Sequence, residues 1–405
     1  MNSPNVTENK KVIVVGAGTA GLAATYTLLQ QKDNVQVTAL EAADHAGGRM
    51  RGDEIGGYFI DTAATMFLES YDTARRLAGE LGVPMRRVTR TKGGQVYSNG
   101  AFHPIFRGGS LKEKFLTART LLSFQLISPR SLWQFFRFVR MLEPRSKDFN
   151  PEDISGILDL DSNQNFTEFA KENGLEGFLN DLAQNDINCY TTAYPEQVSA
   201  VCGMALLWMF SFDPHSNLII PDRGVGSFCT ALADACSKHT RISTPVERIV
   251  IAEGAVKGVV TEAGDMLDAD AVICATTATV ATKIMPDLPS GIRDVMGRIN
   301  YSAALNVVIG LEPDILYEGS FAATFSRNSG SWLSALSNIK IWAPKAVPDG
   351  RNMLHVLVIA DEAREMFPLT DDEIGKRVVA EIRKFLPAMP ERPELLGVYR
   401  WKEAC

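Results

Sequence analysis

The chain has 405 residues, of which 45% are hydrophobic and 22% charged, which is typical of a globular protein with two or three domains. The formal net charge of −7 argues against nucleic acid as a partner. The six cysteines are widely spaced, without a C-x-x-C pair or a zinc-type Cys/His cluster, so we expect no metal site and mostly buried, reduced thiols in the cytoplasm.

The first unit predicted along the chain is a β-α-β unit of about thirty residues. It follows a polar N-terminal stretch that lacks the apolar region of a secretory signal. Residues 11–15 (KVIVV) have the unbroken apolar run of a buried parallel strand, and residues 35–41 (VQVTALE) predict a second strand. We expect a helix between them that ends near Asp33, with a right-handed crossover.

Strand and helix patterns then alternate in blocks up to the end of the chain. The predicted elements are a hairpin over 91–106, two helices within 111–142, a loop over 150–163, helices over 166–209, a strand over 218–220, a helix over 228–236, strands within 241–275, strands over 300–311 and 353–362, and a helix over 371–386. No apolar run reaches the roughly 18 residues that a membrane span needs.

The turn after the first strand, GAGTAG at residues 16–21, fits the dinucleotide-binding pattern G-x-G-x-x-G. Gly16 allows the tight turn, Gly18 lets a diphosphate approach the backbone, and Gly21 lets the helix pack closely on the strand. Glu41 ends the second strand, where a carboxylate can accept hydrogen bonds from both ribose hydroxyls and would repel the 2′-phosphate of NADP. These residues predict a bound dinucleotide and leave NAD and FAD equally open.

The residues after Glu41 favour FAD. Two adjacent glycines and an arginine, Gly47-Gly48-Arg49, predict a second loop that a ligand can approach closely, and an NAD domain needs no such loop. With GAGTAG, Glu41, residues 244–275 (TPVERIVIAEGAVKGVVTEAGDMLDADAVICA), IPDRGVGSF and YRWKEA, the chain resembles the flavin-dependent amine oxidase superfamily. That superfamily includes monoamine and polyamine oxidases, protoporphyrinogen oxidases and carotenoid desaturases.

This resemblance implies an α/β fold, in which a Rossmann-like FAD-binding domain is interleaved with an α+β substrate domain. The FAD-binding domain would take residues 1–105 and 216–285, and the substrate domain residues 106–215 and 286–405. The resemblance implies FAD as the cofactor and places its contacts at Gly16, Ala17, Gly18, Gly21, Glu41, Gly48, Arg49, Ala64, Thr65, Met66 and Val246.

The chain departs from the family pattern at several places. His45 stands where the family commonly has arginine, Ala63 replaces a glycine in the step that runs beside the flavin, and Val225 replaces a glycine of the Pro-x-Gly-Gly loop. The family also continues past the Arg-Trp-x-x-Ala step into a glycine-rich turn and a helix that caps the flavin, and this sequence stops before them, at Cys405. We expect a truncated sequence, and an incomplete flavin pocket is the alternative.

The expected chemistry is hydride transfer from a substrate C–H bond to flavin N5, because the cofactor carries the difficult step. No catalytic side chain is identified. In amine-oxidising members a lysine on a substrate-domain strand holds a water near the flavin. Here Asn306 lies near that place, and no lysine occurs between Lys283 and Lys340. This absence favours dehydrogenation of C–C bonds or rings over oxidation of amines.

Other side chains carry weaker expectations. His355 lies in an apolar strand and is expected to be a core imidazole, whereas His103 is expected to be exposed. Tyr301, Trp332 and Trp342 could line a substrate pocket, and packing is an equally good interpretation for each.

Residues 112–147 form a basic and apolar segment with eight lysines and arginines against two glutamates. Its pattern is typical of substrate-domain helices with solvated charges, which is the interpretation we favour. Peripheral contact with an anionic membrane stays open as the alternative, and it would suit a hydrophobic substrate that enters from lipid.

We therefore expect a cytoplasmic FAD-dependent oxidoreductase that oxidises or desaturates a small hydrophobic molecule, with O₂ or another acceptor reoxidising the flavin. Two alternatives remain: a non-redox flavoenzyme such as a sugar-ring mutase, and a non-catalytic remnant without FAD. The sequence predicts neither the substrate nor the oligomeric state.

Overall fold

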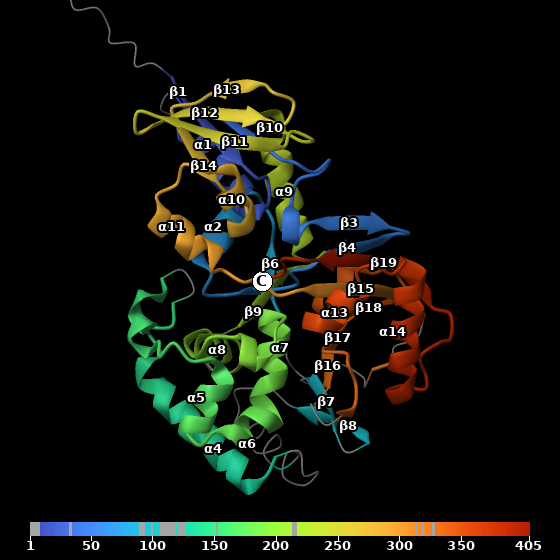
Figure 1. Cartoon of the computed structure of the whole chain (residues 1–405). Helices are drawn as coiled ribbons and strands as arrows, with labels where there is room; N and C mark the ends of the chain where they lie inside the picture. The colour runs from blue at the N-terminus through green and yellow to red at the C-terminus, as the bar shows by residue number, and fades with distance from the viewer. Residues whose placement is uncertain are drawn as a thin grey trace, which may run out of the picture.

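The computed structural model describes residues 9–31, 35–88, 94–98, 100–105, 119, 127–150, 153–212, 217–312, 315–316, 320–325 and 329–405. Figure 1 shows three regions: a parallel-sheet region at the top, a helical region at the lower left and a large sheet at the lower right. The C-terminal residue lies in the centre, where the three regions meet.

The parallel-sheet region has three layers. Its central strands, in the order β10-β2-β1-β14, are β1 (Lys10–Val15), β2 (Val35–Leu40), β10 (Thr240–Arg241) and β14 (Ala271–Cys274). One face packs against α1 (Thr19–Gln30), and the other packs against an antiparallel sheet of β11 (Val246–Ala252), β12 (Ala255–Thr261) and β13 (Met266–Asp268). Val12 and Val14 face α1 while Ile13 and Val15 face the antiparallel sheet, so the last four residues of β1 are buried on both sides and form an unbroken apolar run.

Short elements connect this sheet to the rest of the molecule. They are β3 (Gly52–Ile55), β4 (Tyr58–Asp61), β5 (Phe67–Leu68), α2 (Asp72–Glu80), β6 (Met85–Arg87), β9 (Leu218–Pro221), α9 (Gly226–Cys236), α10 (Ala278–Ile284) and α11 (Ser290–Gly297). β3 pairs with β4, and β9 lies between β5 and β6.

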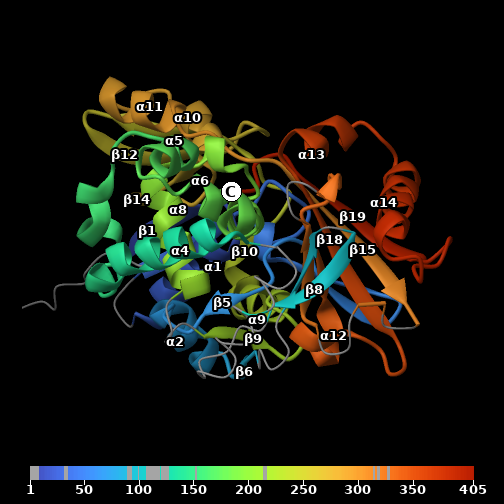
Figure 2. The same cartoon turned by 90° about the horizontal axis from the view of Figure 1, so that it is seen from below.

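The large sheet has seven strands in the order β19-β15-β18-β17-β16-β7-β8. They are β7 (Gly94–Ser98), β8 (Ala101–Ile105), β15 (Ala304–Leu311), β16 (Ala322–Phe325), β17 (Ala335–Asn338), β18 (Asn352–Ile359) and β19 (Glu394–Trp401). The remaining helices of this region are α12 (Ile339–Trp342), α13 (Ala360–Met366) and α14 (Asp371–Phe385). α14 begins with a capping box between Thr370 and Glu373 and covers the outer face of the sheet, as the view from below shows (Figure 2).

The helical region contains α4 (Pro129–Leu142), α5 (Phe166–Glu172), α6 (Glu176–Phe178), α7 (Gln184–Thr191) and α8 (Ala200–Leu207). Phenylalanines dominate its core, where Phe138, Phe166 and Phe178 are fully buried. Ser128 caps the first turn of α4 and Pro129 occupies its first position, a combination that favours helix initiation there.

Most predicted elements are confirmed, and the corrections have local causes. The predicted loop over 150–163 contains a 3₁₀ helix at Ile154–Leu160, which the side chain of Asp153 caps. The strand predicted over 353–362 ends at Ile359, and its last three residues begin α13. The hairpin predicted over 91–106 is present as β7 and β8, and it pairs with β16 of the large sheet. Most of the first helix predicted within 111–142 lies outside the described residues.

Among the described residues, no helix combines the length and the hydropathy that crossing a bilayer requires. The prediction of mostly buried cysteines is wrong: Cys229 and Cys236 are buried, whereas Cys202 and Cys405 are exposed and Cys189 and Cys274 lie in between. His103 is buried rather than exposed, and its Nε2 lies 3.0 Å from the carbonyl oxygen of Ser98 in the partner strand of its hairpin.

Candidate functional site: a dinucleotide cradle

The glycine turn between β1 and α1 has the geometry that the motif requires. Gly16 has a φ of +95°, which favours glycine, and a Cβ on Gly21 would lie 1.8 Å from the carbonyl oxygen of Gly16. Gly18 differs from both, because its φ is −66° and a Cβ there would meet no protein atom closer than Gly48 Cα at 4.0 Å. Gly16 and Gly21 therefore serve the fold, whereas Gly18 leaves open space over the N-terminus of α1.

The second glycine loop lies directly beside this turn. Gly47 forms a parallel bridge with Gly18, and its N–H donates to the carbonyl oxygen of Ala17 at 2.8 Å. Gly48 has a φ of +54°, and a Cβ there would press on Gly18 Cα at 3.2 Å. The two glycine motifs are about thirty residues apart in sequence, a typical spacing for residues joined by a β-α-β unit. In the structure they form one continuous backbone surface.

Glu41 lies at the end of β2 and faces the same turn. Its carboxylate accepts hydrogen bonds from the N–H groups of Ala17 at 2.7 Å and Ala43 at 3.0 Å. Each carboxylate oxygen can accept a further hydrogen bond, as a ribose hydroxyl would require. The segment that leads from Arg241 to Val246 runs alongside Glu41, since the N–H of Thr244 donates to the carbonyl oxygen of Glu41 at 2.7 Å.

A third backbone segment, residues 61–66, extends the surface away from the glycine turn. The N–H groups of Thr62 and Ala64 donate to the carbonyl oxygens of Arg51 and Arg49, at 3.0 and 3.1 Å. Ala64, Thr65 and Met66 are partly exposed at this edge. The exposed guanidinium of Arg49 donates to the carbonyl oxygens of Glu403 and Ala404, at 3.1 Å each, so the last described residues border the same surface.

Asp61 holds this segment against the N-terminus of α9. Its buried carboxylate accepts hydrogen bonds from the N–H groups of Val225 at 3.0 Å and Gly226 at 2.7 Å. A Cβ on Gly224 would lie 2.7 Å from both carboxylate oxygens, which explains the glycine of the PDRGVG loop. Burial raises the pKa of Asp61 to about 7, although the two backbone N–H groups oppose this rise.

Asn306 and His355 form a buried polar pair on the inner face of the large sheet. The Asn306 amide donates to the carbonyl oxygens of Asp61 at 3.0 Å and Thr62 at 3.2 Å and lies 3.4 Å from His355 Nδ1. Since carbonyl oxygens only accept, the amide nitrogen faces His355, and the ring proton must be on Nε2. Burial lowers the pKa of His355 to about 3, so the imidazole is neutral. The prediction of a core histidine is confirmed.

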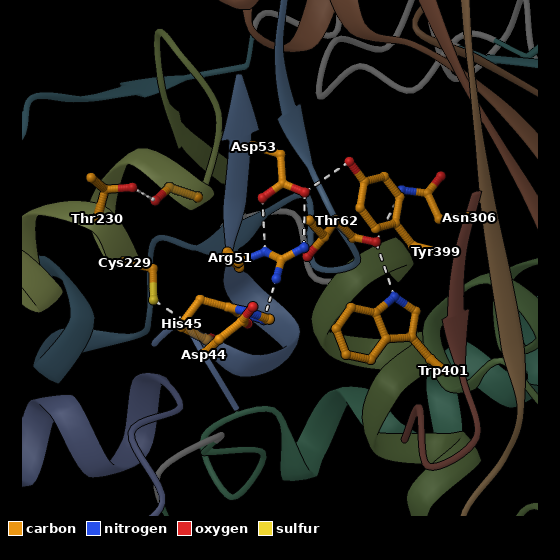
Figure 3. A network of polar contacts seen from close by, with 12 residues as sticks. Asp44, His45, Arg51, Asp53, Thr62, Cys229, Thr230, Asn306, Tyr399 and Trp401 are labelled. Atoms are coloured by element: carbon orange, nitrogen blue, oxygen red, sulfur yellow. Dashed lines mark hydrogen bonds and ion pairs between the residues drawn. The ribbon is translucent and has the colours of Figure 1, made fainter. Parts of the chain in front are cut away.

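A charged network braces the outside of the second glycine loop (Figure 3). Arg51 forms an ion pair with Asp53 at 2.8 Å and contacts His45 Nε2, while the Tyr399 hydroxyl donates to Asp53 at 3.0 Å. His45 is paired in turn with Asp44 at 2.5 Å, and hydrogen bonding to His45 holds the pKa of Asp44 below its usual value. His45, which departs from the family pattern, thus takes part in a local network next to the cradle.

The residues proposed to line a substrate pocket have packing roles in this structure. Trp342 is buried and donates from its indole N–H to the carbonyl oxygen of Phe321 at 2.7 Å, and Trp332 packs on the core beneath α14. The Tyr301 hydroxyl accepts a hydrogen bond from the N–H of Ala278 at 2.8 Å. Asp61 opens the step that the family resemblance places beside the flavin, but its contacts with Val225 and Gly226 join residues 164 and 165 positions apart, which no local pattern indicates. Arg51 was not predicted, although its side-chain partners His45 and Asp53 lie close to it in sequence.

The cradle fits a dinucleotide. Within the described part of the chain, the open space over Gly18, the free acceptor capacity of Glu41 and the N–H of Ala63, which has no acceptor, lie along one surface. The buried hydroxyl of Thr62 also lacks a partner there. No group of three or more histidine, cysteine or acidic side chains suited to a metal occurs among the described residues.

Comparisons with known proteins agree with this geometry. The profile of the family described as flavin containing amine oxidoreductase matches residues 19–405. Coproporphyrinogen III oxidase from Bacillus subtilis is 23% identical over 98% of this chain and 87% of its own length. 15-cis-Phytoene desaturase from Narcissus pseudonarcissus is 23% identical over 95% of this chain and 68% of its own length.

Two solved structures share the fold. A triple mutant of putrescine oxidase has a TM-score of 0.75 at 18% identity, over 98% of this chain and 86% of that one. Cyclohexylamine oxidase from Brevibacterium oxydans has a TM-score of 0.71 at 18% identity, with the same coverages. The expected fold class, a Rossmann-like FAD domain with an α+β partner, is confirmed. The chain belongs to the flavin-containing amine oxidoreductase family and is an FAD-dependent oxidoreductase.

Proposed function

We propose that the chain oxidises or desaturates a small hydrophobic molecule by hydride transfer to the flavin, with O₂ or another acceptor completing the cycle. The observation that carries this proposal is the continuous backbone surface from Gly18 through Gly48 to Ala64, with Glu41 at one end. Bound FAD supplies the hydride acceptor at N5. The N-terminus of α1 would hold the diphosphate, and Glu41 the adenosine ribose.

The remaining expected contacts support this arrangement. Thr65 and Met66 continue the edge that Ala64 begins, and Val246 follows the segment tied to Glu41. We propose that residues 1–105 and 216–285 form the FAD-binding domain and residues 106–215 and 286–405 the substrate domain, with the hairpin β7-β8 reaching across to β16.

The inner face of the large sheet favours a neutral, hydrophobic substrate. Asn306 and His355 are the polar pair of this face closest to segment 61–64, and both are uncharged. Neither can take a proton from a substrate ammonium near neutral pH, because the imidazole pKa is about 3. This favours dehydrogenation at carbon, as the names of the porphyrinogen oxidase and desaturase relatives suggest, over amine oxidation.

Anaerobic mixing tests this function. A porphyrinogen or a carotenoid precursor should bleach the flavin absorbance without an added reductant, air should restore it, and a polyamine should leave it unchanged. Bleaching by the polyamine alone would contradict the proposed substrate class. A flavin that supports turnover only after chemical reduction would favour the mutase alternative, and a folded protein that stays colourless in excess FAD would favour the remnant.

We also propose that α4 attaches the protein peripherally to an anionic membrane. α4 contains no acidic residue, and none of its arginines is paired with a carboxylate of the described residues. Arg137 lies over the Trp133 ring at 5.4 Å and lines a surface hollow with Arg140 and Asn173. The outward residues are Arg130, Trp133 (60% exposed), Phe136 (57%), Arg137, Arg140 and Met141 (40%). In a chain of net charge −7, this cationic and aromatic face suits phosphate headgroups above an apolar layer.

Vesicle sedimentation tests this surface. Trp133→Ser with Phe136→Ser should lower binding to phosphatidylglycerol-containing vesicles by at least about tenfold, because two aromatic side chains no longer enter the bilayer. The matched control is Ile292→Ser with Val295→Ser, which removes two side chains of α11 that are 51% and 56% exposed. An equal loss of vesicle binding in both double variants would contradict the proposal. So would vesicle binding that does not depend on the salt concentration or on the charge of the lipid.

A further inference from the structure

The carbonyl oxygen of Thr62 accepts two side-chain hydrogen bonds, which is as many as it has lone pairs. The Trp401 indole N–H donates at 3.0 Å and the Asn306 amide at 3.2 Å, from neighbouring strands β19 and β15 (Figure 3). Thr62 is fully buried and Asn306 is 6% exposed, so both bonds form away from bulk water. Their strength is therefore greater than that of exposed hydrogen bonds.

The two donors determine where the next N–H group points. The Thr62–Ala63 peptide is trans, so its N–H is directed opposite to its carbonyl, away from β15 and β19. Two donors on the carbonyl polarise the peptide and make that N–H a stronger donor. Among the described residues, nothing accepts from the N–H of Ala63, whereas the neighbouring N–H groups of Thr62 and Ala64 are both used.

This free donor lies on the surface that carries the dinucleotide. Thr62 and Ala64 are bonded to Arg51 and Arg49, and the loop of those arginines begins at Gly48, which touches Gly18. A dinucleotide with its diphosphate over Gly18 and one ribose at Glu41 has a second half that must extend along the cradle. Residues 61–64 form the part of the cradle beyond Gly48.

We propose that Asn306 and Trp401 act as positioning residues that set the reduction potential of the flavin through the Thr62–Ala63 peptide, whose N–H donates to the ring. The inference rests on the proposed function, since it requires FAD in the cradle. A donor aimed at the ring stabilises the negative charge that the ring gains on reduction. Loss of either polarising bond should therefore make the flavin harder to reduce.

The test compares two substitutions on one strand. Trp401→Phe removes the indole donor and keeps an aromatic ring, whereas Tyr399→Phe removes a hydroxyl that bonds to Asp53 and not to the peptide. Trp401→Phe should shift the two-electron reduction equilibrium toward oxidised flavin by about tenfold, or about 30 mV, with a changed flavin absorbance spectrum. Tyr399→Phe should leave the potential unchanged.

Asn306→Ala tests the same peptide through its other donor and serves if Trp401→Phe folds poorly. Asn306→Ala should also lower the potential, and the double variant should fall short of the sum because both donors act on one carbonyl. Equal shifts in Trp401→Phe and Tyr399→Phe, or reduced FAD affinity at an unchanged potential, would overturn the inference. A folded wild type that binds no FAD would instead overturn the proposed function.

Discussion

Gly18→Ala is expected to lower FAD affinity by at least tenfold while leaving the fold of the FAD-free protein unchanged. The φ of −66° suits any residue, and the added Cβ meets no protein atom within 4.0 Å except Gly48 Cα, so the protein has room for it. That methyl group would occupy the space through which a diphosphate approaches the backbone. Fluorescence titration with FAD measures the affinity, and thermal unfolding of the FAD-free proteins measures the fold.

Gly21→Ala provides the contrasting case. Its Cβ would lie 1.8 Å from the carbonyl oxygen of Gly16, a backbone atom that cannot move without displacing the turn. We expect a loss of about 3 kcal/mol or more in the free energy of unfolding, in addition to any loss of FAD. If Gly18→Ala destabilises the FAD-free protein as much as Gly21→Ala does, the open space over the turn has been misinterpreted.

Asp61→Asn is expected to remove a component of stability that depends on pH. The folded-state pKa of about 7 lies above the unfolded value of 3.8, so the folded protein binds this proton more tightly. The contribution of the group to stability is fully present below pH 3.8 and is lost as the pH rises to about 7. Integrated over that window, it amounts to roughly 4 kcal/mol. Denaturant unfolding of both proteins between pH 4 and pH 8 gives the difference curve.

The same substitution should also weaken the junction between β4 and α9 at every pH. An amide offers one acceptor where Val225 and Gly226 need two, so one backbone N–H loses its partner, at a cost of about 1–3 kcal/mol. Asp222→Asn is the matched control. Hydrogen bonding to Lys345 lowers the pKa of Asp222, so the stability that this carboxylate contributes is lost as the pH falls, whereas that of Asp61 is lost as the pH rises. Parallel curves for wild type and Asp61→Asn would show that Asp61 has an ordinary pKa.

The cradle was predictable from sequence where its determinants are local. Gly16, Gly21 and Glu41 belong to one β-α-β unit, so the spacing of a strand, a turn and a helix places them together. The match of residues 244–275 to the family likewise identified the strands that carry Val246. The glycine turn and Glu41 needed only the hydrophobic pattern and the turn chemistry, whereas Val246 was named from the family resemblance of residues 244–275.

The interior of the site was not predictable in the same way, because its contacts join residues far apart in sequence. Asn306 and Trp401 reach Thr62 over 244 and 339 positions, and nothing near Thr62 indicates two donors. His103 lies beside Pro104 in a hairpin, which predicts exposure, yet its side chain is buried on β8, the edge strand of the large sheet. In both cases the tertiary structure outweighs the local pattern.

An FAD titration of the purified protein, followed through its flavin absorbance, shows directly whether the glycine turns and Glu41 hold the cofactor. We expect the wild type to bind one FAD per chain and become yellow, and we expect Glu41→Ala to lose most of this binding because the ribose hydroxyls lose their acceptor. A folded wild type that remains colourless in excess FAD, or a Glu41→Ala variant that binds FAD as tightly as the wild type, would contradict this expectation.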